Sequence, residues 1–134
     1  MIRKDFISAE IEKIAQVLAR VLGFKVEGRI DEAHELIKQT LDSSFSIREN
    51  DFEEFDAEKF RNSLAGYPEK KLDLLAQFLF ESAHPFEDIP ETYNRLRAVL
   101  IIFDLIEKEY KMQSLDNLSK REMIDNFLNN DQYE

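Results

Sequence analysis

Residues 28–41, GRIDEAHELIKQTL, decide the fold class of this chain. Gly28 suits the turn that ends a helix, because glycine adopts the left-handed conformation without a steric penalty. Asp31 and Glu32 follow, and acidic residues are typical of a first helical turn. Apolar residues then recur at spacings of three and four: Ala33, Leu36, Ile37 and Leu41. The stretch therefore predicts a turn followed by an amphipathic helix that starts near Asp31.

The segment before this turn predicts another helix, over about residues 5–25. Its main apolar stripe has helical spacing: Ile7, Ile11, Ile14, Leu18 and Leu22. Val17, Val21 and Phe24 form a second apolar flank, and a helix that is apolar on two sides packs against more than one neighbour. Because the connection to the next helix is short, we expect an antiparallel hairpin.

The rest of the chain predicts four or five further helices. Two short ones fall in residues 46–66, where Ser46 and Glu49 fit a capping box and Asp56 is a second N-cap candidate. Longer helices follow over about residues 68–84, 88–112 and 115–129, and a polar tail continues to residue 134. We expect an all-α domain of six or seven helices. It comprises a first hairpin (1–45), a short-helix insertion (46–67), a second hairpin (68–113) and a C-terminal helix (114–130).

Composition agrees with few, long helices in one domain. The chain has 134 residues but only 3 Gly and 3 Pro, whereas an all-β fold needs frequent turn residues. The net charge of −10 disfavours nucleic acid, which requires clustered Lys and Arg, and it disfavours anionic membranes. A basic protein or peptide is compatible with such a surface.

The chain contains no cysteine, which excludes disulfides and thiolate chemistry. The stretch MIRKDFISAEIEK lacks the apolar segment of a secretory signal. The longest strictly apolar run, residues 98–103, is far shorter than the ~20 residues of a spanning helix. We therefore expect a cytoplasmic protein.

The stretch Gly28, Ile30, Glu32 and Ala33, between one amphipathic helix and the next, resembles the inner turn of a tetratricopeptide repeat. Residues 87–100, EDIPETYNRLRAVL, align with residues 28–41 as a weaker second copy without the glycine. MIRKDFI, LGFKVEGRIDEAHELI and a closing helix after a Ser also resemble a family of uncharacterised bacterial proteins. The resemblance implies a helical-hairpin fold similar to tetratricopeptide proteins, and it implies no catalytic residues.

Two acid-x-x-His pairs are the sharpest candidates for chemistry. Asp31 precedes His34 and Glu81 precedes His84, with three-residue spacing in both cases. Ferritin-like bundles bind two metal ions through Glu-x-x-His motifs. However, Asp31 falls in a first helical turn and His84 in a last turn, where each charge complements the helix dipole. A di-iron or dimanganese enzyme that uses these four residues is therefore the alternative hypothesis, and our main prediction includes no metal or cofactor.

The acidic segment ENDFEEFDAE, residues 49–58, has six acids and no base. It lacks the spacing and the glycine of a calcium loop. Phe52 and Phe55 lie among these acids, where they either receive a basic amphipathic peptide or face the core. Asp104 is expected on the solvent side near Lys108.

We predict a non-enzymatic protein-interaction or scaffolding module with a protein or peptide partner, basic in character, or with a second copy of the chain as a homodimer. The predicted contact residues are Val17, Val21, Phe24, Phe52 and Phe55.

Overall fold

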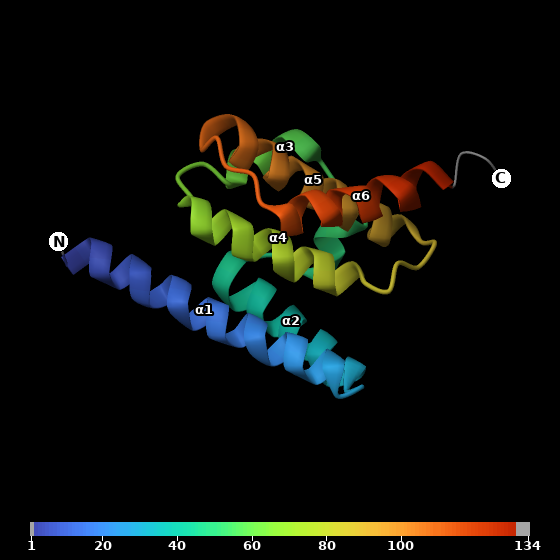
Figure 1. Cartoon of the computed structure of the whole chain (residues 1–134), viewed down its shortest axis with the longest axis horizontal. Helices are drawn as coiled ribbons and strands as arrows, with labels where there is room; N and C mark the ends of the chain where they lie inside the picture. Colours follow the sequence, from blue (N-terminus) through green and yellow to red (C-terminus); the bar gives the residue numbers. More distant parts are fainter. Residues whose placement is uncertain (1, 131–134) are drawn as a thin grey trace.

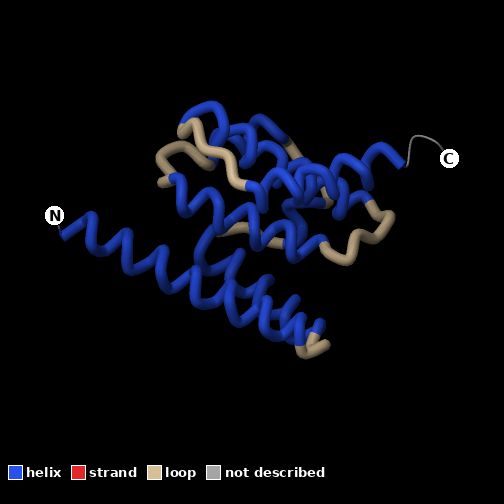
Figure 2. The backbone as a smooth tube through the Cα atoms, in the orientation of Figure 1, coloured by secondary structure: helices blue, strands red, loops and turns tan. Residues whose placement is uncertain are grey.

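The computed structural model describes the backbone of residues 2–130 and the side chains of residues 7–129. Over this range the chain is helical, with connecting loops and no strand (Figures 1 and 2). The elements, in order, are α1 (Ile2–Val26), α2 (Ile30–Phe45), the 3₁₀ helix η1 (Glu49–Phe52), α3 (Ala57–Ser63), α4 (Glu69–Ala83), α5 (Pro90–Glu109) and α6 (Leu115–Asn130). The all-α fold class predicted from the sequence is confirmed.

The helices α1 and α2 form an antiparallel hairpin, with the N-terminal part of α1 projecting beyond the other helices (Figure 1). Gly28 has a φ of 79°, the left-handed conformation expected from its place in the turn. The Arg29 N–H donates to the Phe24 carbonyl oxygen at 2.8 Å and closes the turn. Ile14 and Val21 of α1 are buried, as are Ala33 and Ile37 of α2.

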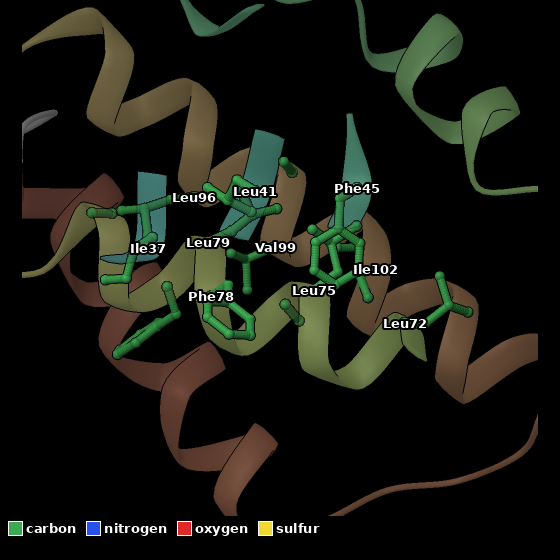
Figure 3. Packing of buried hydrophobic residues seen from close by; sticks show 14 of the residues in the cluster. Ile37, Leu41, Phe45, Leu72, Leu75, Phe78, Leu79, Leu96, Val99 and Ile102 are labelled. Atoms are coloured by element: carbon green, nitrogen blue, oxygen red, sulfur yellow. The ribbon is translucent and has the colours of Figure 1, made fainter. Parts of the chain in front are cut away.

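The centre of the molecule is α4, which packs against both α5 and α2. Figure 3 shows side chains of the three helices interdigitating: Ile37, Leu41 and Phe45 from α2, Leu72, Leu75, Phe78 and Leu79 from α4, and Leu96, Val99 and Ile102 from α5. The helix α5 also packs against α3, η1 and α6, in agreement with the central position that its apolar pattern predicts. Full burial of a side chain of this size stabilises the fold by about 1.5–3 kcal/mol.

The insertion between the hairpins contains η1 and α3, and the structure corrects one of its two predicted caps. Ser46 does not begin a helix: it ends α2 in the left-handed conformation, with φ 55°. The capping interaction lies two residues later, where the Arg48 N–H donates to the Asp51 carboxylate at 2.9 Å. The prediction for Asp56 is confirmed, because its carboxylate accepts from the Lys59 N–H at 3.1 Å.

At the C-terminal end, α5 stops at Glu109, three residues before the predicted Met112. Lys111 has a φ of 54°, which takes the chain out of the helix. The helix α6 then lies along α4 and α5 (Figure 1). Residues 131–134, in the predicted polar tail, are outside the described residues.

Candidate interaction groove

An open groove of about 1050 Å³ lies between the end of α2, the η1–α3 insertion and the start of α4. Its apolar lining includes Phe45, Phe52 and Leu64, each at most 5% exposed. Phe55 and Phe60 are half-buried and also line the groove. The groove therefore has an apolar floor with aromatic surface that a ligand can reach.

The aromatic side chains of the insertion are packed in a row. The rings of Phe52 and Phe55 are stacked with centroids 6.0 Å apart, and those of Phe55 and Phe60 are 5.5 Å apart. Residues of α5 hold this row in place: Asn94 Nδ2 donates to the Phe52 carbonyl oxygen at 2.7 Å, and the Arg95 guanidinium lies 5.5 Å from the Phe52 ring centroid. These contacts to a central helix pre-organise the groove.

Three acidic side chains and the exposed Lys59 form the rim. Asp51, Glu54 and Asp56 line the groove and are exposed. The carboxylates of Asp51 and Asp56 accept backbone hydrogen bonds that cap the short helices. Among the described residues no basic side chain forms an ion pair with Glu54. A free negative charge is therefore available beside the aromatic surface.

Lys71 closes the groove at the start of α4. Its Nζ lies 4.6 Å from the Tyr67 ring centroid and 3.4 Å from a Glu10 carboxylate oxygen. The positive charge is thus partly neutralised by an acid of α1 and by an aromatic face. Among the described lining residues, three acidic groups therefore face two basic groups, Lys59 and Lys71, and Lys71 has an acidic partner outside the groove.

The predicted contact residues fall in two places. Val21 has no exposed surface, so the prediction that it offers a contact surface is wrong: it belongs to the core formed with α2 and α4. Val17 and Phe24 are half-buried and pack against the same core. Phe52 and Phe55 are brought together in the groove, Phe52 as a buried part of the floor and Phe55 as accessible surface.

The structure also brings together three of the four residues of the metal hypothesis. His34 Nε2 lies 3.2 Å from the His84 carbonyl oxygen, and Glu81 is one helical turn before His84. Asp31 is exposed in the first turn of α2. Within the described side chains no three acidic or histidine groups are arranged to hold a metal ion.

Lys25 of α1 is the partner of the Glu81 carboxylate, one of the four groups in the metal hypothesis. Its Nζ lies 2.9 Å from a Glu81 carboxylate oxygen and donates to the carbonyl oxygens of Glu81 at 2.8 Å and His84 at 3.2 Å. An ammonium group satisfies the free carbonyls at the end of α4 and complements its dipole. No local sequence pattern indicates this pairing, because the two residues are 56 positions apart.

Two further ion pairs were not predicted from the sequence: one formed by Asp104 and one formed by Glu32. Asp104 is paired with Arg121 of α6, at 3.2 Å, where the sequence had suggested Lys108 of the same helix. In the α1–α2 turn, hydrogen bonds donated by Arg29 lower the pKa of Glu32 below its usual value. Arg29 and Glu32 are both exposed, and their interaction stabilises the α1–α2 turn locally.

Comparison with known proteins finds no matching family model, no matching curated protein and no matching solved structure. In the described part of the chain, no helix has both the length and the apolar composition needed to cross a membrane.

Proposed function

We propose that this chain is a non-enzymatic, cytoplasmic protein-interaction module that binds a basic amphipathic segment of a partner in the groove between α2, α3 and α4. The observation that carries the proposal is the combination of an aromatic floor with an acidic rim at one site. The tetratricopeptide-like resemblance of the hairpins supports the same class of protein, since stacked helical hairpins leave concave binding surfaces.

The chemistry of the groove selects the partner. Half-buried Phe55 and Phe60 provide aromatic surface of the kind that anchors binding partners. Glu54, which pairs with no basic side chain in the described part of the chain, favours Lys or Arg beside the apolar anchor. The net charge of −10 accelerates the approach of a cationic segment and repels an anionic one.

Binding is tested with two synthetic helical peptides that share one apolar face and carry either Lys or Glu on the other face. Fluorescence anisotropy should show saturable binding of the Lys peptide alone, weakening with salt. Amide chemical shifts in an NMR titration should change mainly for residues 44–71. Shifts spread evenly over the acidic surface would contradict a specific site.

Two charge-reversal variants distinguish specific binding in the groove from non-specific attraction to the net negative charge of the protein. Glu54→Lys changes the rim, whereas Glu122→Lys changes an exposed acid on α6 by the same amount. Replacing attraction by repulsion of about 1 kcal/mol weakens affinity about fivefold. We expect this loss for Glu54→Lys and little change for Glu122→Lys; equal losses in both variants would mean that the peptide binds without using the groove.

Phe55→Ala tests the apolar part of the site. Because Phe55 is half-buried, this variant should fold, and thermal unfolding checks that it does. We expect its affinity for the Lys peptide to fall by tenfold or more, in line with about 2 kcal/mol for an aromatic anchor. Unchanged affinity in a folded variant would remove Phe55 from the binding surface.

A further inference from the structure

The helix α6 is attached to the molecule by polar side chains in its first half and by a few apolar side chains in its second half. Among its described residues only Ile124 is fully buried, and Phe127 and Leu128 are half-buried. The side chains of Leu115 and Met123 are exposed. The Phe127 ring lies 5.2 Å from the Phe86 ring and 5.1 Å from the Tyr93 ring. Apolar contacts therefore hold the second half of α6, and polar contacts place its first half.

Asn117 and Lys120 connect α6 to α4. The amide of Asn117 accepts from Gln77 Nε2 at 3.1 Å and donates to the Asp73 carboxylate at 3.0 Å. The ammonium group of Lys120 donates to Gln77 Oε1 and lies 5.4 Å from the Phe80 ring centroid. Gln77 is 8% exposed, so both of its polar atoms depend on α6 for hydrogen bonds.

Arg121 connects α6 to α5. Its guanidinium pairs with Asp104 at 3.2 Å and with Glu107 at 3.1 Å, and it lies 5.7 Å from the Phe103 ring centroid. The face of α4 and α5 beneath α6 thus combines acidic groups with aromatic rings. Lys120 and Arg121 complement this face in charge and in shape.

The connection between α5 and α6 is short and contains a strained residue. Lys111 has a φ of 54°, a conformation that costs a residue with a Cβ atom free energy relative to glycine. The flanking Met112 is 51% exposed, and the Tyr110 hydroxyl fixes the near end by donating to the Tyr67 carbonyl oxygen at 2.8 Å. Short hinges under strain favour the exchange of an element between protomers.

We propose that α6 exchanges between two copies of this chain, so that α6 of one copy docks on the α4–α5 face of the other. The contacts that place α6 on the α4–α5 face are made by its own side chains. The α6 helix of a second copy carries the same side chains and can make the same contacts. If α6 left this face, Gln77 would lose its hydrogen-bond partners, and Asp104 and Glu107 would lose the Arg121 guanidinium. A second copy is the occupant because its α6 carries the complementary groups. This dimer does not use the interaction groove.

Disulfide trapping tests the exchange directly, because the chain has no cysteine of its own. One chain carries Gln77→Cys and another carries Asn117→Cys; the two are unfolded together, refolded at high concentration and oxidised. We expect a disulfide-linked dimer in the mixture at several times the yield of either variant alone. A chain with both substitutions, refolded when dilute, should form the bond internally and so verifies the geometry. If the double variant forms its internal disulfide but the mixture of single variants forms no disulfide-linked dimer, the proposal is overturned.

Hinge variants provide a second measurement on the full chain. Deletion of Met112 and Gln113 prevents α6 from folding back, so we expect the mass by light scattering to double. Lys111→Gly removes the strain of the closed form and should lower the dimer yield. Adding Lys120→Ala and Arg121→Ala to the shortened chain should return it to a monomer. A helical shortened chain that stays monomeric, or a dimer indifferent to the loss of both cations, overturns the proposal.

Discussion

Truncation of Val21 to alanine measures how firmly α1 is seated on the rest of the molecule. Val21 has no exposed surface. Loss of two methyl groups from the core costs about 1.6 kcal/mol in transfer free energy. The small cavity adds on the order of 1 kcal/mol, and the better helix propensity of alanine offsets about 0.6 kcal/mol. We therefore expect Val21→Ala to lower the free energy of unfolding by about 2 kcal/mol.

Val26→Ala is the matched control, since it makes the same chemical change in the same helix at a residue that is 89% exposed. Its effect should lie within about 0.5 kcal/mol of zero. Urea unfolding followed by circular dichroism measures both variants. The midpoint for Val21→Ala should fall by about 1 M with an unchanged slope.

Equal midpoints for the two variants would refute the placement of Val21 in the core and would return it to the set of surface contact residues. A fall in the slope for Val21→Ala would show that α1 detaches before the rest unfolds. Light scattering on both variants completes the comparison, because a core residue affects association only through folding.

Three further predictions follow from local contacts. Ser46→Gly should stabilise the fold by about 0.5–1 kcal/mol in urea unfolding, because glycine adopts the conformation that ends α2 at no cost; a loss of stability would contradict this. The pKa of Glu32 is lowered by Arg29, so its contribution to stability is present above the unfolded pKa and is lost as pH falls through the folded pKa. NMR should show a lower titration midpoint for Glu32 in the native chain than in Arg29→Gln, and equal midpoints would argue against the hydrogen bonds. Lys25→Met should cost about 2 kcal/mol by leaving the Glu81 carboxylate unpaired, and adding Glu81→Leu should recover part of that loss.

The helices were predictable because their signals are local. Apolar periodicity, the turn at Gly28 and the cap at Asp56 each act over a few residues, and the structure contains all three. Ser46 was misassigned because α2 continues to Phe45. A serine at that boundary fits an N-cap by sequence pattern as well as the left-handed end that it actually forms.

The site was less predictable because it depends on tertiary contacts. The acidic segment and its two phenylalanines pointed to one side of the groove, but Lys71 and the end of α2 come from elsewhere in the chain. Val21 was misplaced because α1 has two apolar flanks, and only its neighbours decide which residues are covered. The pairing of Asp104 with Arg121 likewise follows from the docking of α6 rather than from helix spacing.

The contact of Lys25 with the end of α4 links two helices that are far apart in the sequence. It joins α1 directly to α4 across 56 positions of the chain. Residues 44–71, which carry the groove lining, lie inside the loop that this contact closes. A force applied to the first hairpin therefore has a route to α4 through an ion pair, two hydrogen bonds and helix packing that does not pass along the backbone of the insertion.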